Sequence, residues 1–125
     1  MVNLQLIFLA GDVIISSFNP RSIAMSREAR PDLPTGLLTN VEVDAAAALH
    51  FAAEQGHRWV LPFAERVVEQ GDRFAAKVHD AGLLLGTWIV DGPAEARALL
   101  ATGVDAVATN EPRAIVAACR DLLPS

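Results

Sequence analysis

Residues 83–112 read LLLGTWIVDGPAEARALLATGVDAVATNEP, and their pattern is the clearest indication of the fold class. Two continuous apolar runs, Leu83–Val90 and Val104–Thr109, flank an alanine-rich segment. Because the runs are continuous and do not alternate with polar residues, both of their faces are expected to be covered. The segment between them begins at Pro93 and stops before Gly103, and these residue types typically begin and end a helix. The stretch therefore predicts one strand–helix–strand unit of a parallel sheet.

The same arrangement recurs toward the N-terminus. Apolar runs lie at Asp12–Phe18 and Thr35–Thr39, and a shorter run at Trp59–Leu61 predicts an extra strand. Capping residues before prolines, and glycines after alanine-rich segments, predict helices over residues 20–29, 44–55, 72–81, 93–102 and 112–122. The segment 63–71 is a less regular pattern that Gly71 interrupts. The chain is expected to hold four strand–helix units.

Composition limits the possible functions. The chain has 125 residues, of which 52% are apolar and 20% charged, so residues 1–125 are expected to form one domain with a core. The net charge of −5 argues against a nucleic-acid or anionic-membrane partner, because both need clustered positive charge. One cysteine, Cys119, leaves no intrachain disulfide. The apolar run Leu4–Ala10 is too short to span a bilayer and lacks a basic flank. We therefore expect a cytoplasmic protein without a membrane span.

The number of units raises a structural question. A closed (β/α)₈ barrel takes about 250 residues, and this chain has half of that. The sequence therefore predicts either an open α/β layer or half of a barrel that something else completes.

The residues at the strand ends resemble those of a known family. The motifs that carry the resemblance are Val13–Phe18 followed by Asn19-Pro20, then Arg30–Leu38, His79–Leu83, Thr87–Asp91 and Gly103–Pro112. In this order and spacing they look like the second half of a glycerophosphodiester phosphodiesterase. The resemblance implies an α/β fold in which parallel strands alternate with helices, the C-terminal half (about strands 5–8) of a TIM-type (β/α)₈ barrel, with Val13–Phe18 as the fifth strand.

The resemblance also implies an activity. Members of that family hydrolyse glycerophosphodiesters to glycerol 3-phosphate and an alcohol, usually with a divalent cation such as Mg²⁺ or Ca²⁺. Their catalytic signature is a His-Arg pair, a Glu-x-Asp pair, a His-Asp pair and a Glu-x-Lys on the first four strands. None of those strands is recognisable here. No catalytic residue, metal ligand or cofactor is therefore assigned to this chain, and we expect it to be inactive alone.

The resemblance places three residues at the substrate pocket. Phe18 and Trp88 match positions that line the pocket beside the glycerol portion, where an aromatic wall excludes water. Each side chain is equally well explained as a large residue that closes the top of the core. Ser17 could donate a hydrogen bond to a phosphoryl oxygen. A nucleophilic role for Ser17 is not expected, because no histidine lies at a spacing that would activate it.

Three short motifs repeat parts of the missing signature, and each has a simpler explanation. Glu42-Val-Asp44 has the Glu-x-Asp spacing of a hard cation site, but Asp44 is expected to cap the helix that follows. His57-Arg58 precedes a strand, which would place it at the end of a barrel away from the chemistry. His79-Asp80 lies in the last turn of a helix, where a histidine suits the helix dipole. We interpret all three as coincidence.

Other residues give weaker signals. Gly92 and Asn110 begin helices after strands and could bind phosphate, but the neighbouring Asp91 and Glu111 would repel an anion. Cys119 is expected to be a buried small hydrophobe of the last helix.

Half a barrel would expose strand edges and one apolar face. The expected edges are Val13–Phe18 and Ala106–Thr109. The candidates for the exposed barrel face are Ile14, Leu37, Ile89 and Val107. A homodimer, or pairing with a complementary half-barrel, would cover both, and a small glycerophosphodiester would bind only if a complete site is assembled. The alternatives are a non-catalytic interaction module and a different α/β enzyme, which a metal at Glu42–Asp44 would favour.

Overall fold

The computed structural model describes residues 4–9, 12–17, 21, 25, 28 and 31–122, and for residues 4–17 it describes only the backbone. One sheet runs through the described part, with its strands side by side in chain order. The strands are β1 (Leu4–Leu9), β2 (Asp12–Ser17), β3 (Thr35–Leu38), β4 (Trp59–Leu61), β5 (Leu84–Thr87) and β6 (Ala106–Val107). From β2 to β6 each neighbouring pair is parallel, as the continuous apolar runs predict.

Two features of the sheet differ from expectation. The extra strand, β4, lies in the middle of the sheet, where Trp59 pairs with Gly36 on one side and Leu84 on the other. The described sheet therefore has five parallel strands, and β4 is one of its central strands, not an addition to four others. The run at Leu4–Leu9 forms β1, which pairs antiparallel with β2 from Leu4↔Ser17 to Leu9↔Asp12. Because β1 covers β2, the prediction that Val13–Phe18 is a sheet edge is wrong.

The helices follow the predicted ranges closely, apart from one in the segment 63–71, for which the sequence predicts no clear helix. They are α2 (Ala45–Glu54), α3 (Ala64–Glu69), α4 (Phe74–Asp80), α5 (Pro93–Ala101) and α6 (Pro112–Cys119). The helix predicted over residues 20–29 lies mostly outside the described residues. Asp44 caps α2 by accepting a hydrogen bond from the Ala47 amide at 3.0 Å, as expected. Gly103 follows α5 at φ +105°, which a residue with a Cβ rarely adopts.

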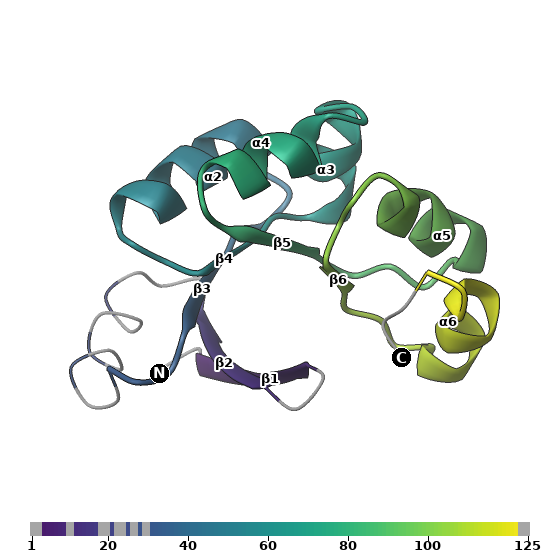
Figure 1. Cartoon of the computed structure of the whole chain (residues 1–125), viewed down its shortest axis with the longest axis horizontal. Helices are drawn as coiled ribbons and strands as arrows, with labels where there is room; N and C mark the ends of the chain where they lie inside the picture. The colour runs from purple at the N-terminus through teal and green to yellow at the C-terminus, as the bar shows by residue number, and fades with distance from the viewer. Residues whose placement is uncertain are drawn as a thin grey trace.

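The helices lie on the convex side of the curved sheet (Figure 1). Between them and the strands lies the main core, in which Val60 and Leu85 are fully buried and Phe74 of α4 is nearly so. Cys119 also belongs to this core, which confirms the prediction that it is buried. Burial of each such large side chain stabilises the fold by about 1.5–3 kcal/mol.

A second, smaller cluster lies on the opposite, concave face of the sheet. It contains Leu38, Trp59 and Leu61, with Leu84, Trp88 and Ala106 packed against it. Alternation along each strand puts these residues opposite Leu37, Val60 and Leu85. Two of the residues predicted for the barrel face, Leu37 and Val107, instead pack in the helix-side core, so that prediction is wrong for them.

The other two residues predicted for that face have different outcomes. Ile89 follows β5 and is 45% exposed. Ile14 lies in β2, where the description covers only the backbone.

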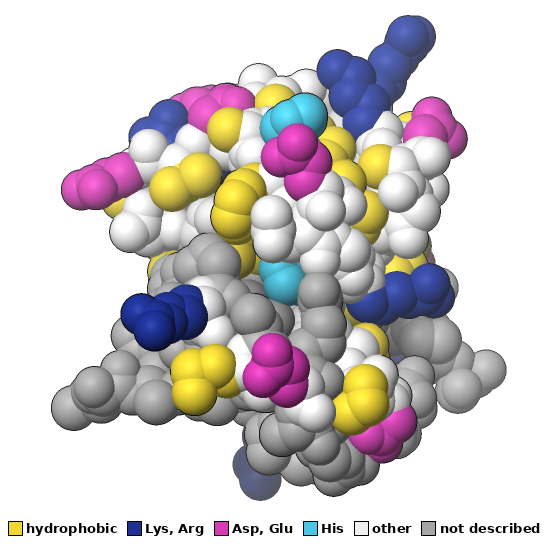
Figure 2. All heavy atoms as spheres, turned by 90° about the vertical axis from the view of Figure 1, so that its left-hand side faces the viewer, with side chains coloured by type: hydrophobic (Ala, Val, Ile, Leu, Met, Phe, Trp, Pro, Cys, Tyr) yellow, Lys and Arg dark blue, Asp and Glu magenta, His cyan; other side chains and the backbone are white. Residues whose placement is uncertain are grey.

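The face shown in Figure 2 carries acidic, basic and hydrophobic side chains next to one another. Among the described residues, no helix has both the length and the apolar character needed to cross a membrane.

Candidate functional site

The parallel strands end together at one edge of the sheet, which we call the C-terminal edge. It is marked by the last residues of β3, β4, β5 and β6, namely Leu38, Leu61, Thr87 and Val107. In barrel enzymes the loops that follow these positions build the active site. The residues that could act on a ligand are therefore those that directly follow the strands.

Trp88 directly follows β5 at this edge, where its side chain is half-buried. Its indole Nε1–H donates a hydrogen bond to the Leu61 carbonyl at 2.9 Å. Its ring meets Phe63 edge-to-face, with centroids 5.1 Å apart and planes at 88°. Its own carbonyl accepts a hydrogen bond from the Ala64 amide at 2.9 Å. The indole is thus held in one orientation by the segment that joins β4 to α3.

Two threonines donate hydrogen bonds to residues 61 and 62, which directly precede Phe63. The Thr87 hydroxyl donates to the Pro62 carbonyl at 2.9 Å and is almost completely buried. The Thr39 amide donates to the Leu61 carbonyl at 3.2 Å, so that carbonyl accepts from Thr39 and Trp88 together. The Thr39 hydroxyl is buried without a hydrogen-bond partner in the described part of the chain.

The loops after β5 and β6 are joined through Asp91. Its carboxylate accepts hydrogen bonds from the Asn110 amide at 2.7 Å and from the Thr109 hydroxyl at 3.0 Å. The bond from the Asn110 backbone is the main reason that the pKa of Asp91 lies below its ordinary value of 3.8. Because the Asn110 amide already donates to Asp91, that amide is not available to a phosphate. The weak sequence indication of a phosphate site at Asn110 is therefore not supported.

The three predicted pocket residues have different outcomes. Trp88 lies at the C-terminal edge, as the resemblance implies. Ser17 is the last residue of β2 and pairs in register with Leu37, and only its backbone is described. Phe18 lies outside the described residues.

Phe63 was missed by the sequence analysis. The sequence signal for it is its position two residues after a strand, at Leu61-Pro62-Phe63. The sequence predicts Trp59–Leu61 only as an addition to the sheet, which gives no reason to assign a site residue to its C-terminal end.

In the Glu42–Asp44 motif the Asp44 carboxylate is engaged in structural contacts. Besides capping α2, Asp44 accepts a hydrogen bond from the Gln70 side chain at 3.0 Å through its other oxygen. The Glu42 amide donates to the Asn40 side chain. Among the described residues, no three His, Cys, Asp or Glu side chains come together in a group that could hold a metal ion.

The two histidine motifs lie at the opposite end of the strands. His57 precedes β4, and its Nδ1 is 2.7 Å from the hydroxyl of Thr35, the first residue of β3. His79 Nε2 is 2.7 Å from the Asp105 carboxylate, which also accepts from the amide of Leu85. These contacts join the elements that precede the strands, away from Trp88.

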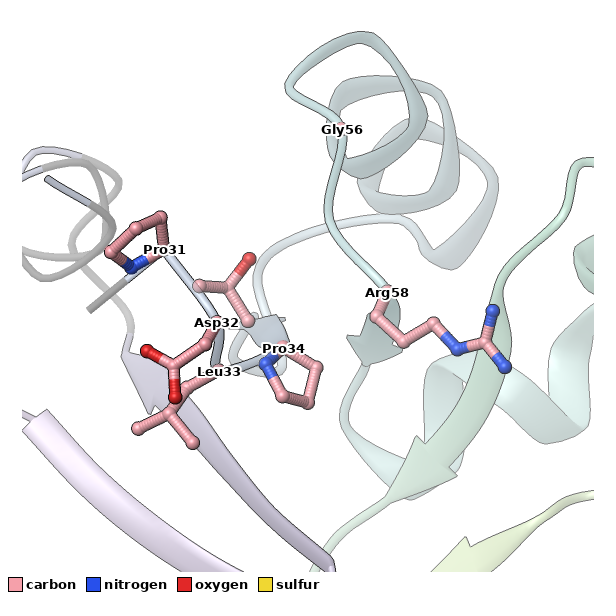
Figure 3. A pocket seen from close by; sticks show the side chains of 7 residues that line it. Pro31, Asp32, Leu33, Pro34, Gly56 and Arg58 are labelled. Carbon is pink, nitrogen blue, oxygen red and sulfur yellow. The ribbon is translucent and has the colours of Figure 1, made fainter.

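A cavity of about 430 Å³ also lies at that opposite end. Figure 3 shows it between Pro31 and Asp32, which precede β3, and Gly56 and Arg58, which precede β4. The Arg58 side chain extends away from Asp32. The cavity is therefore separate from the residues at the C-terminal edge.

Comparisons with known proteins identify the family. The model of the glycerophosphoryl diester phosphodiesterase family matches residues 5–114. No curated protein matches the chain.

Solved structures agree with this match. A protein from Silicibacter pomeroyi assigned to the glycerophosphoryl diester phosphodiesterases is 25% identical, with a TM-score of 0.74 over 87% of this chain and 38% of its own. A phosphodiesterase from Oleispira antarctica, solved with the product sn-glycerol-3-phosphate, is 16% identical, with a TM-score of 0.74 over 87% of this chain and 42% of its own. A glycerophosphodiester phosphodiesterase from Parabacteroides distasonis is 17% identical, with a TM-score of 0.64 over 86% and 41%.

The chain spans about two fifths of the length of these solved relatives. The match supports a partial barrel in which parallel strands alternate with helices, as the strand-end motifs predict. With a family model covering most of its length and relatives that share its fold, the chain belongs to the glycerophosphoryl diester phosphodiesterase family.

Proposed function

We propose that this chain contributes part of the substrate pocket for hydrolysis of glycerophosphodiesters to glycerol 3-phosphate and an alcohol. The observation that carries the proposal is Trp88, whose indole is fixed at the C-terminal edge by the Leu61 carbonyl and by Phe63. The likeness to the Oleispira antarctica protein, which was solved with sn-glycerol-3-phosphate, supports the choice of product.

The proposed pocket uses simple chemistry. The face of an indole ring packs against the C–H groups of a glycerol and excludes water from that side. Phe18 is proposed as a second wall, and Ser17 as a donor to a phosphoryl oxygen. These roles place the protein in lipid and glycerol metabolism. A cytoplasmic location is part of the proposal, supported by the lone, buried thiol of Cys119.

The described residues do not fit a divalent cation. A hard cation needs several converging carboxylate or carbonyl oxygens, and among the described residues no three His, Cys, Asp or Glu side chains come together in such a group. We therefore derive no metal-dependent step in this chain. The proposal is that the acid–base groups and the metal ligands come from residues other than these, and that this chain alone does not turn over substrate.

Binding of the product tests the pocket. In ¹H–¹⁵N spectra the chain has two indole resonances, from Trp59 and Trp88. Titration with sn-glycerol 3-phosphate is expected to shift the Trp88 indole resonance saturably. Trp59, which is 7% exposed and begins β4 at the opposite end of the strands from Trp88, serves as an internal control and should move little. A titration in which neither resonance moves would contradict the proposed pocket.

A second candidate is a non-catalytic half-barrel module that self-associates or pairs with a complementary half. It is favoured by the sheet itself, because the described helices lie on the convex side (Figure 1), and the cluster found on the concave side of the described residues is the small one around Trp59. In the described residues β6 pairs with β5 alone, so it presents an edge. Residues 1–125 would act as one domain in such a pair. A monomeric mass by light scattering at micromolar concentration would exclude self-association.

A further inference from the structure

Helix α3 begins after an apolar residue. Its N-cap is Phe63, whose side chain forms no capping hydrogen bond, as is also true of the N-caps of α4, α5 and α6. Ser, Thr, Asp and Asn are preferred at this position because their side-chain oxygens accept from the free amides of the first turn, and an apolar residue there typically costs about 1 kcal/mol. The local sequence is therefore not optimised for starting this helix.

The contacts across the C-terminal edge explain the exception. The first amide of α3, that of Ala64, donates to the Trp88 carbonyl at 2.9 Å, so the backbone of Trp88 satisfies an amide of the first turn. In return, the Phe63 ring lies edge-to-face against the Trp88 indole, and the two residues form an isolated parallel bridge. The first turn of α3 and Trp88 thus stabilise each other's position.

Residues that break a local rule are expected mainly at functional sites. An apolar N-cap would add little to the helix-side core, because Phe63 is only partly buried and belongs to neither core cluster. Its ring instead packs edge-to-face against the ring of Trp88.

We propose that Phe63 is a positioning residue, which acts by fixing the orientation of the Trp88 indole at the pocket. The inference rests on the proposed function for its consequence, the affinity for a glycerol phosphate. The hydrogen bond from the indole to the Leu61 carbonyl fixes the nitrogen end of the ring. The edge-to-face contact fixes the plane of the ring, which determines the face that a ligand would meet.

The test compares Phe63→Leu with Phe63→Tyr in the full chain. Leucine keeps an apolar side chain but removes the ring, whereas tyrosine keeps the ring. An edge-to-face aromatic pair stabilises the position of both rings, so its loss in Phe63→Leu should make the indole N–H of Trp88 more accessible. Solvent exchange of that N–H should become roughly two- to tenfold faster. The Trp59 indole, on the concave face, should exchange at an unchanged rate in both variants. Phe63→Tyr should restore the wild-type exchange rate at Trp88.

The ligand arm uses sn-glycerol 3-phosphate as the probe. Phe63→Leu should weaken its binding by the same roughly two- to tenfold, and Phe63→Tyr should not. Unchanged Trp88 exchange in Phe63→Leu would overturn the proposal, as would equal changes at Trp59 and Trp88, which would indicate a general loss of stability. If the wild-type chain does not bind the probe, the proposed pocket fails, while the exchange rates still decide whether Phe63 positions Trp88.

Discussion

Gly86 of β5 allows the concave face of the sheet to pack. A Cβ added at Gly86 would lie 2.8 Å from Cδ2 and 3.3 Å from Cγ of Leu61. Leu61 is itself 5% exposed, between Leu38 and Trp59, so it has little space into which to move. We predict that Gly86→Ala destabilises the fold because it overpacks this cluster.

The magnitude follows from two opposing contributions. Overpacking of a well-packed core costs about 1–3 kcal/mol. Alanine in place of glycine inside a strand stabilises by about 0.5–1 kcal/mol. The net loss is therefore about 0–2.5 kcal/mol, and each kcal/mol lowers the midpoint of thermal unfolding by about 3–5 °C for a chain of this size.

A double-mutant cycle separates the two contributions. In a Leu61→Ala background the clashing atoms are gone, so Gly86→Ala should become stabilising by about 0.5–1 kcal/mol. Urea unfolding followed by circular dichroism gives all four free energies. If Gly86→Ala has the same cost in both backgrounds, the packing of Leu61 over Gly86 is refuted. A stabilising effect in the wild-type background would refute it equally.

Two further predictions concern the helices and the acid limb of stability. Gly103→Ala should cost about 1–2 kcal/mol in urea unfolding, because φ is +105° and the new Cβ would lie 3.2 Å from that of Ala75. Gly71→Ala, at φ +84° with no atom within 4 Å, should cost less. The hydrogen bonds and charge of Arg97 lower the pKa of Asp121 from 3.8 to about 2, so this pair stabilises the fold above pH 3.8 and the contribution disappears as the pH falls toward 2. Asp121→Asn should flatten that part of the pH dependence, and an unchanged acid limb would contradict the assignment.

The alternation of strands and helices could be predicted from the sequence because its signals are local. Pro93 and Pro112 begin α5 and α6, and Asp44 caps α2, as their types at those positions predict. Gly71 and Gly103 have positive φ where a helix ends. These features depend on neighbouring residues alone.

The faces of the strands could not be predicted in the same way. A strand that is covered on both sides has a continuous apolar pattern, so the pattern does not tell which residues face the helices. Leu37 and Leu38 are both leucines in β3, yet the first packs in the helix-side core and the second in the concave cluster. The strand β1 was not predicted either. Its antiparallel pairing with β2 joins two segments of the chain, and the apolar pattern of residues 4–9 alone does not indicate it.

The candidate site was only partly predictable for a related reason. Trp88 was identified through a family motif that includes its own neighbours in sequence. Phe63 lies 25 residues away and has no motif of its own, and its role follows only from the ring contact with Trp88. Contacts between distant segments are a property of the folded chain.

The most direct test of the central claim is release of glycerol 3-phosphate from glycerophosphocholine, measured with Mg²⁺ or Ca²⁺ and with a chelator control. The claim is that this chain supplies pocket residues but not the acid–base or metal-binding groups. We predict no chelator-sensitive turnover by the chain alone. Turnover that is abolished both by the chelator and by Glu42→Ala would contradict the claim, because it would show that this chain assembles a working metal site of its own.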